Sequence, residues 1–164
     1  MKPASKIILV VTLIAYLFIL LNVTVFRSTI TMFNNIFLAE NNYITSVQTA
    51  LEQANFKPFH AVHYYLISQQ EPLKVGIANT LGNVLLFIPL GIFLPLLWMR
   101  FRSIKSVLLA ISFTSLLIEI TQLLTATGVF DVDDILLNTF GGVIGYAIFT
   151  TTANARQTEA TKKL

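Results

Sequence analysis

Charged residues are scarce in this chain of 164 residues: Asp, Glu, Lys and Arg together make up 12% of it. Hydrophobic residues make up 55%, and the mean hydropathy is +0.73. A soluble domain carries about 25% charged residues, so this chain has too little charge to cover a water-facing surface and is predicted to be a membrane protein. Cysteine is absent, which excludes disulfides, thiolate metal sites and a cysteine nucleophile.

Four apolar stretches are long enough, or nearly so, to cross a membrane, because about 20 apolar residues span the hydrocarbon core as a helix. They cover residues 7–26, 77–99, 106–126 and 134–151. The sequence therefore predicts an all-α fold, in which residues 1–164 form a single polytopic membrane domain with a bundle of about four transmembrane helices. The first stretch could also be a cleaved signal peptide, but its uninterrupted length is more typical of a retained anchor.

The basic residues indicate which way the bundle crosses the membrane. Eight of the eleven lie in the N-terminal segment, the connection between the second and third stretches, and the C-terminal tail: Lys2, Lys6, Arg100, Arg102, Lys105, Arg156, Lys162 and Lys163. With four crossings these segments share one side, and the positive-inside rule makes that side the cytoplasm. Both termini are therefore predicted to be cytoplasmic and residues 27–74 extracytoplasmic. This placement accounts for the net charge of +3 without a nucleic-acid partner.

The extracytoplasmic segment has a pattern of its own. Apolar residues recur at helical spacing from Ile44 through Leu51 to Ala54, which predicts an amphipathic helix on the outer leaflet. After it, residues 59–67 are rich in aromatic side chains, which favour the membrane interface. Residues 60–73 are accordingly interpreted as interfacial or partly re-entrant.

Strongly polar side chains of the second to fourth helices all fall in the outer halves of these helices. Asn79 lies four residues before Asn83, and Glu119 lies three before Gln122, so each pair shares one helix face. Seven residues are predicted to form a ligand-binding pocket open to the outside: Asn79, Asn83, Glu119, Gln122, Asp131, Asp134 and Asn138. The alternative is that these groups only join the helices through hydrogen bonds.

Among the predicted pocket residues, Glu119 is the main candidate for a chemical role. A carboxylate inside the bilayer costs about 3 kcal/mol on insertion scales unless it is paired or protonated, so Glu119 is expected to face the bundle. Glu119, Asp133 and Asp134 are the candidate catalytic residues. Glu119 would act as general acid or base, while an aspartate holds a metal ion or orients a water.

The acidic cluster before the fourth helix could also bind a divalent cation, because carboxylate oxygens suit Mg²⁺, Mn²⁺ and Ca²⁺. The candidate metal ligands are Asp131, Asp133, Asp134, His60 and His63. The alternative is a solvated turn in which Asp133 or Asp134 caps the fourth helix, with the two histidines packed at the interface.

The glycines of the second and fourth helices are interpreted as packing residues. Gly82 and Gly91 lie in the second helix, and Gly141 and Gly145 lie four apart in the fourth. Small residues at this spacing let two membrane helices approach closely.

Four blocks of the sequence, in their order and spacing, resemble the VanZ-like family of bacterial membrane proteins. They are NFKPF at 55–59, GNVLLFIPLG at 82–91, EITQ at 119–122 and FDVDDILLNTFGG at 130–142. The resemblance covers about residues 55–146, and the first helix carries no such match. Many members have an Arg shortly before the last block where this chain has Gly128, so a cation at that position is not carried over.

The resemblance implies a protein of the bacterial cytoplasmic membrane, and the family's namesake is associated with low-level resistance to the lipoglycopeptide teicoplanin. One hypothesis is a non-catalytic protein that contributes to envelope protection by binding a lipid-linked cell-wall precursor or a lipoglycopeptide. The alternative is an intramembrane enzyme that acts on an envelope lipid precursor. Transport is a weaker hypothesis, because a single charge within the helices offers little of a path across the inner half. Binding is favoured, because no motif specifies a reaction.

Overall fold

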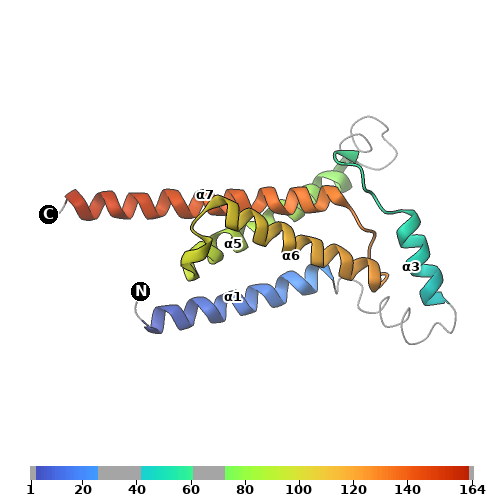
Figure 1. The fold of residues 1–164 in the computed structure, drawn as a ribbon, viewed down its shortest axis with the longest axis horizontal. Coiled ribbons are helices and arrows are strands. Elements are labelled where there is room, and N and C mark those ends of the chain that lie inside the picture. The colour runs from blue at the N-terminus through green and yellow to red at the C-terminus, as the bar shows by residue number, and fades with distance from the viewer. Residues whose placement is uncertain (1–2, 26–41, 61–72, 163–164) are drawn as a thin grey trace.

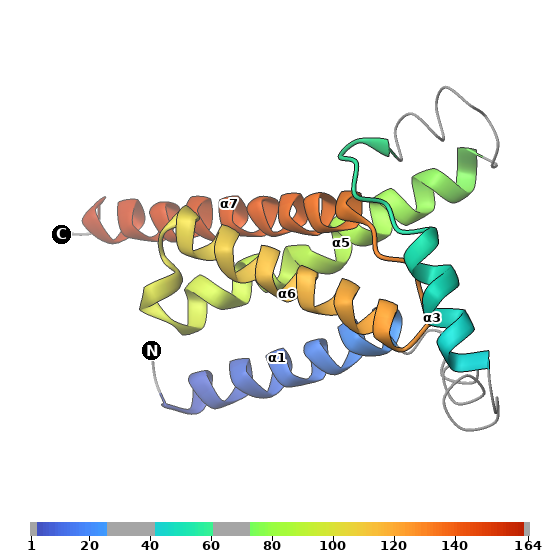
Figure 2. The same cartoon turned by 45° about the vertical axis from the view of Figure 1, so that its right-hand side comes forward.

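The computed structural model describes residues 3–25, 42–60 and 73–162. In chain order its helices are α1 (Pro3–Thr24), α3 (Asn42–Glu52), α5 (Leu73–Leu97), the short 3₁₀ helix η4 (Met99–Phe101), α6 (Ile104–Leu124) and α7 (Val132–Lys162). Figure 1 shows α1, α5, α6 and α7 running along one another, with the start of α1 and the end of α7 at the same end of the bundle. The helix α3 lies across the opposite end (Figure 2).

Four of the described helices are long and apolar enough to cross a membrane, over Pro3–Thr24, Gly76–Leu97, Ile104–Leu124 and Val132–Ala155. The protein is therefore a multi-pass membrane protein built as an all-α bundle, which confirms the predicted fold class.

The ends of these helices differ from the predicted spans. The largest difference is in α7, which continues to Lys162 instead of ending near residue 151. Hydropathy falls after residue 151, but Ala, Arg, Gln and Glu are good helix formers, so the helix extends beyond its apolar stretch. The predicted end of the first span, Phe26, lies outside the described residues.

Large apolar side chains cover the outside of the bundle. Phe18 in α1, Leu109 in α6 and Phe140 in α7 are 69%, 74% and 57% exposed. A continuous apolar surface of this kind is unfavourable in water, whereas its contact with lipid tails carries no such free-energy cost. The outward surface therefore agrees with the membrane class that the composition predicts.

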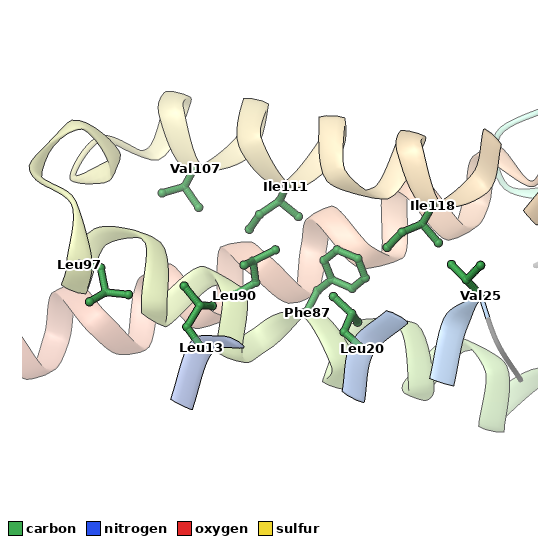
Figure 3. Packing of buried hydrophobic residues seen from close by; sticks show 9 residues of the cluster. All are labelled: Leu13, Leu20, Val25, Phe87, Leu90, Leu97, Val107, Ile111 and Ile118. Carbon is green, nitrogen blue, oxygen red and sulfur yellow. The ribbon is translucent and has the colours of Figure 1, made fainter. Parts of the chain in front are cut away.

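The interior of the bundle is a column of apolar side chains, shown in Figure 3. Phe87 lies in it with no exposed surface. Its buried members come from the α1 region, α5 and α6: Leu13, Leu20, Val25, Phe87, Leu90, Leu97, Val107, Ile111 and Ile118. None of these residues comes from α7, which contributes glycines instead.

The contact between α5 and α7 depends on these glycines. A Cβ atom added at Gly141 would lie 2.1 Å from the carbonyl oxygen of Val84, and one at Gly145 would lie 2.0 Å from that of Ile88. Backbone atoms cannot turn aside as a flexible side chain can, so only glycine permits this approach. The predicted packing role of this glycine pair is confirmed.

The helix α3 corresponds to the predicted amphipathic stretch. The Tyr43 hydroxyl donates a hydrogen bond to the carbonyl oxygen of Leu124, which attaches α3 to the end of α6. Ile44 and Leu51 are 67% and 48% exposed, so part of the apolar face is left for lipid. The predicted interfacial stretch falls mainly on residues 61–72, outside the described residues.

Candidate functional site

A cavity of about 370 Å³ lies between the four long helices. It is lined by the end of α1, the first half of α5, the end of α6 and the start of α7, with all seven predicted pocket residues among its walls: Asn79, Asn83, Glu119, Gln122, Asp131, Asp134 and Asn138. Its volume lies within the usual range of about 300–1,000 Å³ for small-molecule sites. The structure thus brings together residues that are up to 59 positions apart in the sequence.

Glu119 is both buried and in the wall of this cavity. Its side chain is only 2% exposed, and its Oε2 atom accepts a hydrogen bond of 2.9 Å from the backbone N–H of Asp131. A buried carboxyl group needs such a partner, because burial removes its hydrogen bonds to water. This bond fixes the carboxyl group of α6 against the start of α7.

Asp131 caps α7, which corrects the predicted capping role of Asp133 or Asp134. The helix begins at Val132, so Asp131 occupies the N-cap position, and its Oδ1 atom accepts a hydrogen bond of 2.8 Å from the backbone N–H of Asp133. The same oxygen accepts a hydrogen bond of 2.7 Å from Nδ2 of Asn55.

The pKa of the Asp131 carboxyl group lies above its usual range. Burial is the main cause, and the negative charge of Asp133 adds to it. The hydrogen bonds from the Asp133 backbone and from Asn55 act in the opposite direction, as does the nearby His60. The effect of burial on the pKa of Asp131 therefore outweighs that of the hydrogen bonds it accepts.

The segment at residues 55–59 runs beside the start of α7 and holds it in place. The backbone N–H of Asn55 donates to the carbonyl oxygen of Phe130 at 2.8 Å, and the N–H of Val132 donates to the carbonyl oxygen of Asn55 at 3.0 Å. The rings of Phe56 and Phe130 stack with their centroids 5.2 Å apart. Two of the family-like blocks, far apart in the sequence, therefore form one local structure.

Asp133 accepts a hydrogen bond from this segment and does not line the cavity. Its Oδ1 atom accepts a hydrogen bond of 2.5 Å from the backbone N–H of Phe59, and the residue is 5% exposed. Phe59 has a φ of 65°, a left-handed conformation that is uncommon for residues other than glycine. Of the three candidate catalytic residues, the cavity walls include Glu119 and Asp134 and not Asp133.

Asn138 joins α7 to α6 by a side-chain hydrogen bond, and its carbonyl oxygen is buried. Its Nδ2 atom donates a hydrogen bond of 2.8 Å to Oγ of Ser115, and both residues are buried, at 3% and 0% exposure. Its Oδ1 atom is buried without a hydrogen-bond partner. Such a carbonyl oxygen normally has a partner in a folded protein, and among the described residues it is a buried side-chain acceptor without one.

Amide side chains make the other polar contacts across the cavity. Nε2 of Gln122 donates a hydrogen bond of 2.9 Å to the carbonyl oxygen of Thr24, which joins α6 to the end of α1. The side chain of Asn83 interacts with the carboxyl group of Asp134 and so links α5 to α7. The predicted pocket residues therefore also join the helices by hydrogen bonds, which was the alternative to ligand binding.

The candidate metal ligands do not converge on one point. Among the described residues, no group of three His, Cys, Asp or Glu side chains is arranged to hold a metal ion. His60 is exposed and does not line the cavity, and His63 lies outside the described residues.

Three residues that contact or line the site, Ser115, Asn55 and Gly82, were not predicted to belong to it. Ser115 lies four residues before Glu119, so helical spacing alone could have added it to the polar face of α6. Asn55 belongs to a family-like block, but nothing in its own pattern points to Asp131. The predicted packing role of Gly82 is wrong, because a Cβ atom there would meet nothing within 4 Å, and Gly82 instead lines the cavity.

Comparisons with known proteins identify one family. The family model described as VanZ/LLP1 matches residues 6–153, so it includes the first helix, which the four sequence blocks left unmatched. No curated protein and no solved structure matches the chain.

Proposed function

Because the chain belongs to the VanZ/LLP1 family, we propose that it is a binding protein of the bacterial cytoplasmic membrane that contributes to protection of the cell envelope. Its ligand is a lipid-linked cell-wall precursor or a lipoglycopeptide, and the protection takes the form of low-level resistance to teicoplanin. The cavity between the helices is the binding site.

The observation that carries this proposal is the position of Glu119. A buried carboxyl group in the wall of a cavity of about 370 Å³ is a poor choice for packing alone, because leucine would fill the same space without a desolvation penalty. Its single fixed bond to the Asp131 backbone leaves the carboxyl group in place to meet a ligand.

The orientation of the protein is part of the proposal. The start of α1 and the end of α7 share one end of the bundle (Figure 1), and η4, with Arg100, joins α5 to α6 at the far end of these helices from the cavity. The positive-inside rule then makes the end with the basic residues cytoplasmic. With both termini in the cytoplasm, the cavity faces the outer leaflet, where cell-wall precursors and glycopeptides meet.

Teicoplanin susceptibility of a sensitive Gram-positive host tests the proposal directly. The host expresses the wild type, Glu119→Leu, Gly82→Leu or Asp133→Asn, and membrane levels are matched by immunoblot. Gly82→Leu adds a side chain to the cavity wall at a position where a Cβ atom meets nothing within 4 Å, and we expect it to narrow the cavity. Asp133→Asn is the matched control, because it removes a neighbouring carboxylate outside the cavity and keeps an oxygen for the Phe59 N–H.

We expect the wild type and Asp133→Asn to raise the teicoplanin concentration needed for inhibition, and the two cavity variants to lose this effect. A wild type that inserts normally but gives no protection would contradict the proposal. Protection that survives Gly82→Leu would contradict the role of the cavity.

An intramembrane enzyme is the second candidate, because Glu119 and Asp134 both line the cavity. Glu119 would act as general acid or base on an envelope lipid precursor, and Asp134 would orient a water. The two functions differ in their response to Glu119→Gln, which keeps hydrogen bonding but cannot transfer a proton. An enzyme would lose all activity with Glu119→Gln, whereas a binding protein would keep more of its effect with Glu119→Gln than with Glu119→Leu.

A further inference from the structure

The short connection between α5 and α6 concentrates positive charge on one surface. Arg100, Arg102 and Lys105 lie close together in the sequence, and all three are exposed. Figures 1 and 2 show this connection at the end of the bundle where α1 begins, whereas the cavity is lined by the other ends of α5 and α6. We refer to Arg100, Arg102 and Lys105 as the basic turn.

The charge of the basic turn is not balanced by carboxylates of the described chain. The sequence has no Asp or Glu between Glu71 and Glu119, and Glu119 lies in the cavity wall. Within the described part of the chain, none of the three cations is in an ion pair. Like charges this close repel one another, so an anion from outside the chain would stabilise the turn.

The basic turn is also held in a defined conformation. The Tyr146 hydroxyl donates a hydrogen bond of 2.6 Å to the carbonyl oxygen of Arg102, which attaches the turn to α7. The guanidinium carbon of Arg100 lies 4.7 Å from the centroid of the Phe101 ring, a cation–π contact that orients this side chain. The positive-inside rule depends on the number of basic residues and not on their arrangement, so it does not account for these contacts.

Exposed apolar side chains lie directly before the basic turn. Trp98 is 40% and Met99 is 77% exposed, and both follow the transmembrane helix α5, which ends at Leu97. Tryptophan favours the boundary between hydrocarbon and head groups, so the neighbouring cations lie at the depth of lipid phosphates. A phospholipid would cover the apolar side chains and meet the cations, whereas a free inorganic anion would leave Trp98 and Met99 uncovered.

We propose that the basic turn binds the phosphate of an anionic phospholipid, whose acyl chains cover Trp98 and Met99. Arginine holds a phosphate through two parallel N–H···O bonds, and lysine adds a point charge. Phosphatidylglycerol offers such a phosphate with a net negative charge, whereas the ammonium group of phosphatidylcholine neutralises the same phosphate. This inference concerns the opposite end of the bundle from the cavity and does not depend on the proposed function.

Quenching of tryptophan fluorescence tests the inference, because Trp98 is the single tryptophan of the chain. The purified full-length protein is reconstituted into vesicles of equal parts phosphatidylglycerol and phosphatidylcholine. In one preparation the phosphatidylglycerol has brominated acyl chains, which quench a nearby indole, and in the other the phosphatidylcholine has them. The wild type is compared with Arg102→Gln. Lys57→Gln is the matched control, because it removes an exposed cation from the other end of the bundle.

We expect brominated phosphatidylglycerol to quench Trp98 more strongly, with a relative binding constant of about tenfold or more. Arg102→Gln should lower this preference about fivefold, as expected for one basic residue at an anionic membrane surface, whereas Lys57→Gln leaves it unchanged. Equal quenching by the two lipids in the wild type would overturn the proposal. An equal loss in Arg102→Gln and Lys57→Gln would also overturn it, because the attraction would then come from the net charge of the whole protein.

Inorganic phosphate distinguishes the lipid from a free anion. Sodium phosphate and sodium chloride are added to the same vesicles at matched ionic strength, so that both salts screen charge equally. We expect the two salts to weaken the preference for phosphatidylglycerol to the same extent. A much larger loss in phosphate would show that the basic turn takes up a free phosphate, and would overturn the assignment to a lipid.

Discussion

The helices α5 and α7 meet in two different ways along their length. Towards the middle of the membrane they touch backbone to backbone, with Gly91 and Gly145 against the facing helix. Nearer their first residues the same two helices also line the cavity, with Asn83 and Asn138 among its walls. The tight half brings the two backbones together at the glycines, and the open half, which lines the cavity, carries polar groups that a dry, closely packed contact could not accommodate.

Two glycine-to-alanine variants give the largest expected contrast between these halves. Gly145→Ala would place a Cβ atom 2.0 Å from the Ile88 carbonyl oxygen, so the helices must separate, at an expected loss of about 1–3 kcal/mol or more in the free energy of unfolding. Gly82→Ala meets nothing within 4 Å and should raise helix stability by about 1 kcal/mol. Thermal denaturation in detergent measures both, and equal effects would contradict the division into two halves.

Two substitutions of Glu119 sharpen the description of the open half. Glu119→Leu leaves the Asp131 N–H without its acceptor, so we expect a loss of about 1–3 kcal/mol in the free energy of unfolding. Glu119→Gln keeps an oxygen in the same place and should lose less. Titration with SDS compares the two variants, and a leucine variant as stable as the wild type would show that the buried bond does not hold α6 to α7.

Removal of the Asn55 side chain tests whether the segment at residues 55–59 stabilises the start of α7. Asn55→Ala loses the 2.7 Å bond to Asp131, and we expect a loss of about 1–2 kcal/mol, with the glycine contact unaffected. Hydrogen exchange should show faster exchange at the start of α7 and unchanged exchange around Gly145. Uniform acceleration along α7 would instead indicate that the two halves unfold together.

The pH dependence of Asp131 is expected to give the smallest effect. Because the pKa of Asp131 is raised in the folded protein, ionisation is less favourable there than in the unfolded chain, and the charged group lowers stability at neutral pH. This loss is relieved as pH falls through the raised pKa towards the ordinary value. Asp131→Asn should therefore gain stability relative to the wild type at neutral pH, and the gain should shrink on acidification. A gain that grows at low pH would contradict the direction of the shift.

Spans, helix periodicity and charge bias were enough to predict the bundle and seven of the polar residues that line the cavity. These features are local, because the apolar length of a helix and the face that holds Glu119 and Gln122 follow from residue spacing. The contacts of Asp131 with Asn55 and of Asp133 with Phe59 could not be predicted in the same way. They join residues more than 70 positions apart, and one of them uses a backbone N–H, which leaves no mark in the sequence. Asp133 bonds to Phe59 whereas Asp134 lines the cavity. This difference depends on the first turn of α7, in which two neighbouring side chains point in different directions.

Labelling of single cysteines in intact cells tests most directly whether the cavity is open to the outside. The natural chain has no cysteine, so Gly82→Cys in the cavity and Leu109→Cys on the lipid-facing surface each provide a unique thiol. The reagent is a membrane-impermeant, positively charged methanethiosulfonate. We predict that Gly82→Cys reacts from outside the cell and that Leu109→Cys does not. Reaction of Gly82→Cys only after permeabilisation would show that the cavity opens to the cytoplasm, and no reaction under either condition would show that it is closed to water.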